Sequence, residues 1–195
     1  MIISDEFKFV YIDVPKTAST SFERLFREQF FGKTVYPSHD KKTTKHCREI
    51  PEHATDYTKV ISVRNPYERA SSLYSYHLRV TDKTQDACSF ENFLDVIIEN
   101  QEKYESDNYL MYLPIHRYLS PMTLTSPVYF IQLENATEQV NLLPFVHEPL
   151  SMTHHNITKK KISVTMTDAI IEKIKTWAGS DFKMGGYDEN ITSFS

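Results

Sequence analysis

The sequence predicts an α/β domain built around a mostly parallel central sheet. Three apolar runs, at residues 8–14, 59–63 and 128–133, have the length and composition of buried strands, and a segment of helical character follows each of them. Strands that alternate with helices are typical of parallel sheets, because a crossover helix joins successive parallel strands. The 195 residues suit one sizeable core, so we expect a single domain over residues 1–195.

The first third of the chain contributes two strands to this prediction. A strand is expected at Lys8–Val14, a helix at Thr20–Phe31 and a short helix near Thr44–Ile50. A second buried strand is expected at Lys59–Val63. The apolar residues that recur at helical spacing in the first helix are Phe22, Leu25, Phe26 and Phe30.

Capping residues mark the starts of two further helices. Asn65 is followed by Pro66, and this pair predicts a helix start because Asn caps helices well and Pro suits the first turn. Ser89 precedes a run of apolar residues at helical spacing, which predicts a second capped helix. The segment Asn108–Pro127 is rich in Tyr and Pro, and we interpret it as a loop with short helical turns.

The last part of the chain contributes one strand and two helices. A buried strand is expected at Val128–Leu133 and a helix at Glu134–Leu143. A long polar connection over Pro144–Ser163 leads to a helix at Thr167–Ala178. We expect this helix to end at Gly179, since glycine is a common C-terminal stop.

Composition excludes several classes of partner. The net charge of −4 gives no general attraction to nucleic acids or anionic membranes. No signal peptide and no run of about 18 apolar residues is present, so a membrane span is not expected. Cys47 and Cys88 are too few for a disulfide framework, and the histidines lack the close spacing of zinc ligands. We therefore expect a cytoplasmic protein without a metal, in which any anion site is local.

The segment Pro15–Ser21, with sequence PKTASTS, is the first candidate anion site. It joins the first strand to the first helix and combines one lysine with several hydroxyls. The N–H groups of a first helical turn lack helical partners, and the helix dipole favours negative charge there. The segment has no glycine and is not a Walker A loop. An ordinary strand–helix turn with a Ser or Thr N-cap is the alternative interpretation.

A second candidate anion site follows the strand at Lys59–Val63. Arg64 comes directly after the strand, and Arg69 and Ser72 are three residues apart, so they share one face of the next helix. A guanidinium group and a hydroxyl at a helix start can bind a phosphate-like group. The alternative is a solvated helix face with a chance pair of basic residues.

Together the two segments resemble the two cofactor motifs of PAPS-dependent sulfotransferases, where PAPS is 3′-phosphoadenosine 5′-phosphosulfate. The resemblance is greatest to carbohydrate sulfotransferases of the heparan sulfate 2-O-sulfotransferase type and to small bacterial relatives. It assigns Arg64 and Ser72 to the 3′-phosphate. It assigns to the 5′-phosphosulfate the residues Lys16, Thr17, Ala18, Ser19, Thr20 and Ser21. Ala18 departs from the family, which often has glycine there, but it keeps the N–H donor.

Weaker resemblances extend along the chain. Phe130–Asn135 is similar to the family's strand that ends in Glu-Asn, and Asp181–Tyr187 is similar to its C-terminal signature. His154–Lys161 resembles the loop that closes over the nucleotide, which implies that Asn156 and Lys159 bind the cofactor. The fold implied by the resemblance is a three-layer, P-loop-like domain whose sheet is flanked by helices.

Sulfuryl transfer needs a group that stabilises the leaving phosphate and a base that accepts the proton of the acceptor hydroxyl. Lys16 is suited to the first role. His39 and His46 are candidates for the second, because the pKa of histidine lies near neutrality. His39 precedes Arg64 by 25 residues, as the base often does in the family, and is preferred to His46. Glu23 is a third candidate.

The predicted function is the transfer of sulfuryl from PAPS to a hydroxyl group, on a carbohydrate or another acceptor, with PAP as the product and no metal. Two alternatives remain. One is a nucleotide-dependent phosphoryl-transfer enzyme of the kinase type, although the Walker A sequence and a strand-end Asp for magnesium are missing. The other is a PAP-binding module without catalytic activity.

Overall fold

The computed structural model describes most of the chain in two compact units. The described residues are 1–30, 33–34, 48–82, 88–120, 122, 124–152 and 162–190. Unit 1 comprises Met1–Arg64 and Arg117–Ile157, and unit 2 comprises Asn65–His116 and Thr158–Ser195. The single domain over residues 1–195 stays a prediction.

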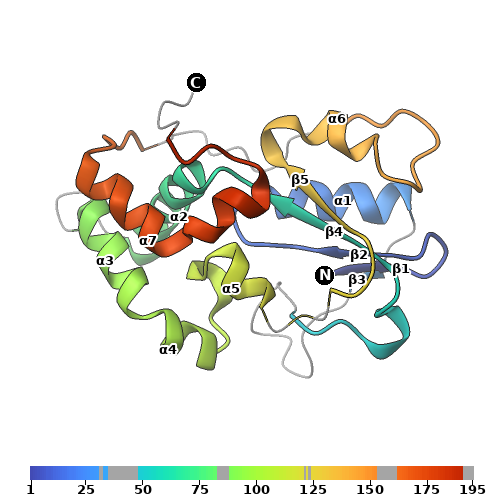
Figure 1. Ribbon diagram of the computed structural model, residues 1–195, viewed down its shortest axis with the longest axis horizontal. Coiled ribbons are helices and arrows are strands. Elements are labelled where there is room, and N and C mark those ends of the chain that lie inside the picture. Colours follow the sequence, from blue (N-terminus) through green and yellow to red (C-terminus); the bar gives the residue numbers. More distant parts are fainter. Residues whose placement is uncertain are drawn as a thin grey trace. The chain divides into compact units, whose positions relative to one another are not determined.

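Unit 1 is built on a five-stranded mixed sheet with the order β3-β1-β2-β4-β5 (Figure 1). The strands are β1 (Ile2–Ser4), β2 (Phe9–Ile12), β3 (Lys33–Thr34), β4 (Thr58–Val63) and β5 (Val128–Gln132). β2, β4 and β5 are parallel neighbours, whereas β1 pairs antiparallel with both β2 and β3. The predicted α/β class with a mostly parallel sheet is confirmed, whereas β1 and β3 were not expected.

Two helices of unit 1 pack on the same face of its sheet. They are α1 (Ser19–Gln29) and α6 (Ala136–Val140), drawn in blue and orange in Figure 1. Aromatic rings dominate the contact, and the ring of Phe9 stacks on that of Phe145 with centroids 4.4 Å apart. The buried core on this face includes Tyr11, Phe22, Phe26, Val60, Ile131, Ala136 and Val140. The three-layer arrangement stays a prediction.

The parallel pairing brings the Pro15–Ser21 segment and Arg64 to one edge of the sheet. Ile12, the last residue of β2, pairs with Ile61 of β4. The chain that leaves β2 and the chain that leaves β4 after Val63 therefore depart at the same carboxyl edge. In α/β sheets, ligands bind beyond this edge.

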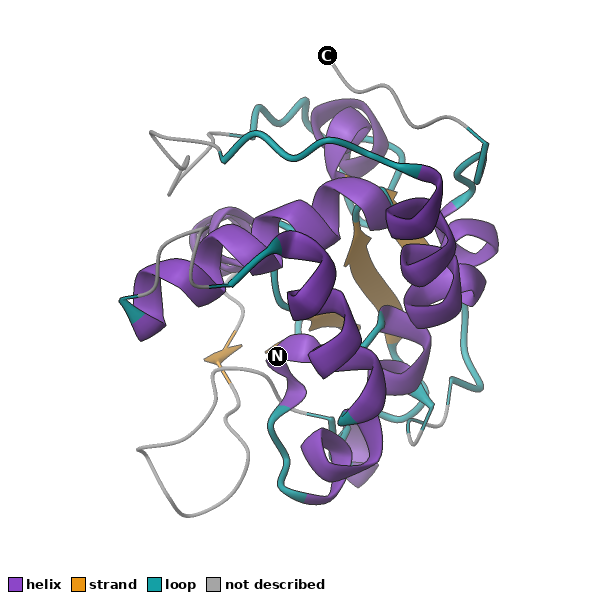
Figure 2. Cartoon of the chain, turned by 90° about the vertical axis from the view of Figure 1, so that its left-hand side faces the viewer, coloured by secondary structure: helices purple, strands orange, loops and turns teal. Residues whose placement is uncertain are grey.

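The described residues of unit 2 form helices and loops, without a strand (Figure 2). Its helices are α2 (Pro66–Thr81), α3 (Phe90–Glu99), α4 (Gln101–Ser106) and α7 (Asp168–Gly185), with a 3₁₀ turn η2 (Leu110–Tyr112). The short α5 (Ile115–Leu119) leads from unit 2 into unit 1. Two more 3₁₀ turns, η1 (Glu52–Ala54) and η3 (Leu133–Asn135), belong to unit 1. The core includes Leu73, Tyr74, Phe93, Leu94, Ile97, Ile174 and Trp177.

Both helix caps predicted in unit 2 are confirmed. The Asn65 side chain accepts a hydrogen bond from the Tyr67 N–H at 2.9 Å, and α2 begins at Pro66. The Ser89 hydroxyl accepts one from the Asn92 N–H at 3.1 Å, and α3 begins at Phe90. These signals are local, which explains why the sequence was sufficient to find them.

Three details of the predicted elements were wrong. The helix predicted over Thr167–Ala178 does break at Ala178, where φ is −135°, but the chain does not leave the helix there. A second helical segment, which was not predicted, continues through Gly179, buries Phe182, ends at Gly185 and is capped by Gly186, where φ is +69°. The strand β5 is not buried: only Ile131 is, because β5 is a sheet edge. The third error concerns Thr44–Ile50, of which residues 44–47 lie outside the described residues.

The part of that segment that is described, residues 48–50, is not helical. Arg48 instead donates hydrogen bonds to two carbonyls of α5, from Nε to Tyr118 O at 3.2 Å and from Nη2 to Arg117 O at 3.1 Å. These contacts join residues about 70 positions apart, so no local pattern could have predicted them.

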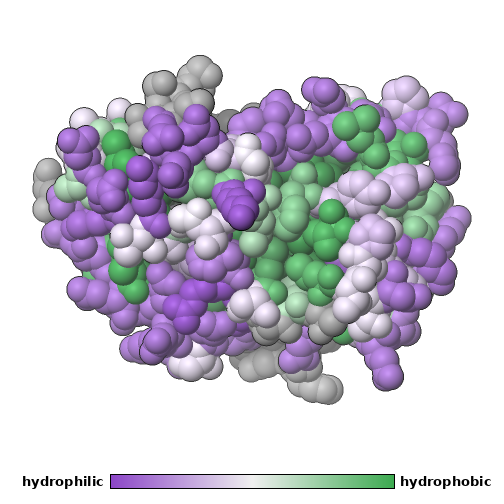
Figure 3. All heavy atoms as spheres, in the orientation of Figure 1, coloured by the Kyte–Doolittle hydropathy of each residue, from purple (hydrophilic) through white to green (hydrophobic). Residues whose placement is uncertain are grey.

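The surface combines polar and apolar regions. On the face in Figure 3, hydrophilic side chains dominate over the helices of unit 2, and apolar side chains gather over the strands of unit 1. None of the helices in the described part of the chain has both the length and the apolar character needed to cross a membrane.

Candidate active site

The chain between β2 and α1 adopts an unusual backbone conformation. Lys16 and Ala18 both have positive φ, of 67° and 59°, a region that residues other than glycine rarely occupy. Backbone that turns through left-handed residues can direct successive N–H groups toward one point, a geometry that binds anions. The left-handed Ala18 also explains why glycine suits this position.

The start of α1 has no capping side chain at its N-cap position. Its N-cap is Ala18, which provides no side-chain hydrogen bond, and its first turn contains no acidic residue. The alternative interpretation of the Pro15–Ser21 segment as a turn with a Ser or Thr N-cap was therefore wrong. An anion placed there would accept hydrogen bonds that a capping side chain accepts in most helices.

Within the Pro15–Ser21 segment, the side chains face different environments. Lys16, Ser19 and Thr20 are half-buried, whereas Thr17 and Ser21 are buried. The Thr17 hydroxyl donates to the Val14 carbonyl at 2.9 Å and lies 2.6 Å from the Ser62 hydroxyl of β4. Its side chain therefore holds the segment in place, and what Thr17 offers to a ligand is its main-chain N–H. The roles of these residues in cofactor binding stay predictions.

Arg64 and Ser72, the predicted ligands of a 3′-phosphate, lie in different units. Arg64 follows β4 directly and is half-buried, at the sheet edge from which the Pro15–Ser21 segment also leaves. Ser72 lies in the middle of α2 and is half-buried. Their shared role stays a prediction.

Arg69 does not serve as an anion ligand, contrary to its interpretation as the partner of Ser72. Its side chain is fully buried in unit 2, where Nη2 donates to the Leu113 carbonyl at 2.8 Å. The guanidinium group lies over the Trp177 ring, 5.2 Å from its centroid, and Nη1 is 4.0 Å from the Asp181 carboxylate. The physical reason is helical periodicity: Arg69 precedes the buried Leu73 by four residues and shares its face.

A histidine–carboxylate pair in unit 2 was not predicted. The buried Asp181 carboxylate accepts hydrogen bonds from the N–H groups of Ile115 and His116, at 2.7 and 2.9 Å, at the start of α5. It also accepts one from the ring Nδ1 of His116 at 2.8 Å. In the neutral imidazole this places the proton on Nδ1 and leaves Nε2 as the basic nitrogen, an arrangement that orients a general base.

The His116 side chain is 32% exposed, so its ring is accessible to solvent. The sequence indicated one member of the His116–Asp181 pair, because Asp181 belongs to the segment Asp181–Tyr187 that resembles the family signature. Its partner is 65 residues away along the chain, and only the tertiary structure brings the two together.

Comparison with protein families adds an independent observation. A model described as the sulfotransferase family matches residues 1–178, which include described parts of both units. The chain belongs to the sulfotransferase family. Neither the curated proteins nor the solved structures returned a match. The predicted enzyme class is therefore confirmed, whereas the resemblance to the heparan sulfate 2-O-sulfotransferase type stays a prediction.

Several predicted site residues of this sulfotransferase lie outside the described residues. They are His39, His46, Asn156 and Lys159. The third base candidate, Glu23, is described: it is half-buried on α1, and its Oε1 lies 3.8 Å from Nη1 of Arg27. The role of Glu23 as a base stays a prediction.

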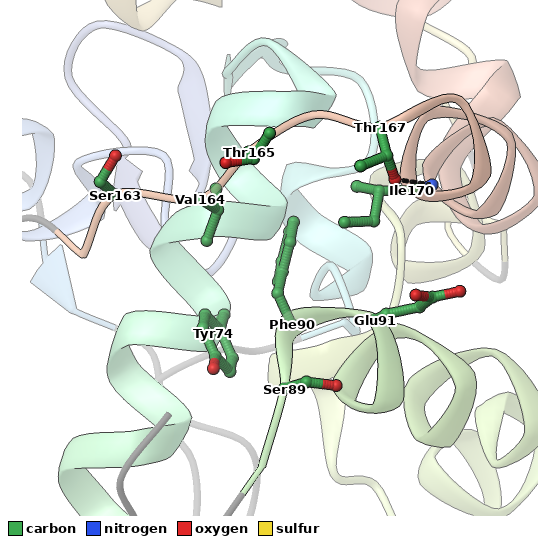
Figure 4. Close-up of a pocket in the computed structure, with 9 residues that line it drawn as sticks. All are labelled: Tyr74, Ser89, Phe90, Glu91, Ser163, Val164, Thr165, Thr167 and Ile170. Carbon is green, nitrogen blue, oxygen red and sulfur yellow. Dashed lines mark hydrogen bonds between the residues drawn. The ribbon is translucent and has the colours of Figure 1, made fainter. Parts of the chain in front are cut away.

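A cavity of about 340 Å³ lies within unit 2 of the sulfotransferase (Figure 4). Its wall includes Ser89 and Thr167, the N-caps of α3 and α7, together with Tyr74 of α2. Thr167 accepts a hydrogen bond from the Ile170 N–H at 3.3 Å, drawn as a dashed line in Figure 4. None of the residues that line this cavity belongs to the predicted cofactor site.

Proposed function

We propose that this sulfotransferase transfers the sulfuryl group of PAPS in line to a hydroxyl group of a carbohydrate. The observation that carries the proposal is the backbone between β2 and α1. Two left-handed residues lead there into a helix start whose N-cap residue, Ala18, provides no side-chain hydrogen bond, with Lys16 beside it. This arrangement suits an anion of high charge density.

The residues of the site fit PAPS in two places. The N–H groups of the Pro15–Ser21 segment and the Lys16 ammonium group would hold the 5′-phosphosulfate. Arg64, which follows the neighbouring parallel strand, would bind the 3′-phosphate together with Ser72. Asn156 and Lys159 would close over the nucleotide. Arg64 can donate two parallel hydrogen bonds to a phosphate, which a lysine cannot do.

The chemistry requires one bond to form and one to break. PAPS supplies the sulfuryl group, whose sulfur bonds to the acceptor oxygen as its bond to the 5′-phosphate oxygen breaks. Lys16 stabilises the negative charge that develops on that phosphate. A histidine removes the proton of the acceptor hydroxyl, and His39 is the first choice, with His46 second. The oriented imidazole of His116 makes it a further candidate.

A calorimetric titration tests the cofactor assignment. We expect PAP to bind tightly with no magnesium present, and ATP to bind weakly with or without magnesium. Tight binding of ATP that depends on magnesium would instead indicate a phosphoryl-transfer enzyme. The control is adenosine 5′-phosphate, which lacks the 3′-phosphate and should bind at least about tenfold more weakly than PAP, since each charge-assisted contact contributes about 1.5–3 kcal/mol.

Turnover tests the catalytic assignment. Candidate carbohydrates would be incubated with radiolabelled PAPS, and the sulfated product identified by mass spectrometry. With an acceptor in hand, His39→Ala, His46→Ala and His116→Ala are compared. Loss of the base should lower kcat about 100-fold or more while PAP affinity is kept. If PAP binds but none of a broad set of acceptors is sulfated, the chain is a nucleotide-binding module without catalytic activity.

A further inference from the structure

A chain of three buried hydroxyl groups runs through unit 1 and ends in the segment that precedes α1. The Tyr11 hydroxyl on β2 lies 2.8 Å from the Ser62 hydroxyl on β4, which lies 2.6 Å from the Thr17 hydroxyl. Thr17 in turn donates to the Val14 carbonyl at 2.9 Å. The three residues Tyr11, Ser62 and Thr17 are all fully buried.

The direction of every hydrogen bond in this chain follows from the number of protons available. A carbonyl only accepts, so the single proton of Thr17 is committed to Val14. Ser62 must therefore donate to Thr17, and Tyr11 must donate to Ser62. Burial raises the pKa of the Tyr11 phenol well above its ordinary value, which keeps this first donor protonated. The first two bonds point from the sheet toward Thr17 in the segment, and the third joins Thr17 to Val14, the residue just before the segment.

The chain ends where the backbone is strained. Thr17 lies between Lys16 and Ala18, the two left-handed residues, and such conformations persist only where surrounding contacts hold them. The Thr17 hydroxyl therefore joins the segment to the chain just after β2, through the Val14 carbonyl, and to β4, through the Ser62 hydroxyl. The ring of Tyr11 also packs against those of Phe22 and Phe26 of α1, with ring centroids 5.6 and 4.9 Å apart.

We propose that Tyr11 and Ser62 are positioning residues of the sulfotransferase, which act through Thr17 to hold the Pro15–Ser21 segment in its anion-binding conformation. The inference rests on the proposed function, because it assumes that this segment binds the 5′-phosphosulfate. Buried hydroxyls in a core otherwise lined by aromatic rings are costly unless each is hydrogen-bonded. Support of the segment through Thr17 accounts for the presence of the Tyr11 and Ser62 hydroxyls in this core.

The test measures PAP affinity and thermal stability in parallel. Thr17→Val keeps the side-chain shape and removes both hydroxyl contacts, and Thr17→Ser restores the hydroxyl. Ser62→Ala removes the middle of the chain, and Tyr11→Phe removes only its first donor, so it is the variant most certain to fold. The matched control is Ser4→Ala in β1. The buried Ser4 hydroxyl donates to the Phe30 carbonyl at 2.9 Å, at the opposite end of the sheet.

We expect Thr17→Val and Ser62→Ala to raise the Kd for PAP at least about tenfold at a temperature where each variant is folded, because small misplacements of binding groups have large effects. Tyr11→Phe should raise the Kd a few-fold, and Thr17→Ser should recover most of the affinity that Thr17→Val loses. Ser4→Ala should lower the Tm and leave the Kd unchanged.

Two results would overturn the inference, and they can be told apart. If Thr17→Val, Ser62→Ala and Tyr11→Phe lower the Tm but bind PAP as the unmodified chain does, the hydroxyl chain is purely structural and the proposed function stands. If the unmodified chain itself does not bind PAP, the proposed function fails and this inference fails with it.

Discussion

Arg64 and Arg69 are only five residues apart, yet the structure gives them different environments. Arg64 is half-buried at the carboxyl edge of the sheet, whereas Arg69 is fully buried beneath Trp177 in unit 2. The sequence suggested an anion-binding role for both. The difference shows that charge and spacing do not decide whether a basic side chain meets a ligand.

The position of each residue within its secondary structure accounts for the difference. Arg64 follows Val63, the last residue of β4, and the next residue, Asn65, is already the N-cap of α2. Arg69 lies one turn into α2, on the face that carries Leu73 into the core. The same spacing in the sequence therefore fits both an arginine that binds a ligand and a buried arginine that pairs with a carboxylate and an aromatic ring.

The largest expected effect is on the stability of unit 2. Arg69→Met removes the hydrogen bond to Leu113 and the charge beside Asp181, so the free energy of unfolding should fall by about 3 kcal/mol or more. Urea unfolding monitored by circular dichroism measures this change. The matched control is Arg64→Met, because Arg64 is only half-buried, and its replacement should lower the free energy of unfolding clearly less than Arg69→Met does. Equal losses in both variants would contradict the comparison.

The next effect is on the rate of transfer. Lys16→Met removes the charge proposed to stabilise the leaving phosphate, and kcat should fall about 100- to 1,000-fold, as when a donor to a developing oxyanion is lost. Thermal unfolding of Lys16→Met shows whether the variant is folded at the assay temperature. Steady-state kinetics with an acceptor that the enzyme sulfates measure kcat. Lys16→Arg serves as the control that keeps the charge. A rate unchanged in Lys16→Met would rule out this role.

A smaller effect is expected on nucleotide affinity. Arg64→Met should raise the Kd for PAP about tenfold or more, because a charge-assisted hydrogen bond contributes about 1.5–3 kcal/mol. The affinity for adenosine 5′-phosphate, which has no 3′-phosphate, should stay the same in this variant. Calorimetric titration of Arg64→Met and of the unmodified chain with both nucleotides measures these Kd values. A parallel loss of affinity for both nucleotides would show that Arg64 does not contact the 3′-phosphate.

The smallest effect concerns the left-handed Ala18. Glycine adopts this conformation without the steric cost of about 1–2 kcal/mol that alanine carries, although it gains entropy in the unfolded chain. Ala18→Gly should therefore raise the free energy of unfolding by about 0.5 kcal/mol. Asp82→Gly is the control, because Asp82 has a φ of 52° at the end of α2, away from any predicted site residue. A lower Tm for Ala18→Gly would contradict the claim that Ala18 carries a steric cost in the left-handed conformation.

The sequence by itself was sufficient for features that depend on neighbouring residues. The strands at β2 and β4, the caps Asn65 and Ser89, and the segment that enters α1 were all predicted within a few residues. The parallel relation of β2 and β4 also followed, because alternating strands and helices have few possible arrangements. Together these placed Lys16 and Arg64 at the same edge of the sheet.

Only the tertiary structure decided features that depend on partners far away in the chain. It buried Arg69, joined His116 to Asp181 across 65 residues and carried α7 past Gly179 to bury Phe182. It also showed that Thr17 turns its hydroxyl toward Ser62, 45 residues away, rather than toward a ligand. The physical reason is that burial and hydrogen-bond partners are set by packing, which overrides local preference wherever a core must be filled.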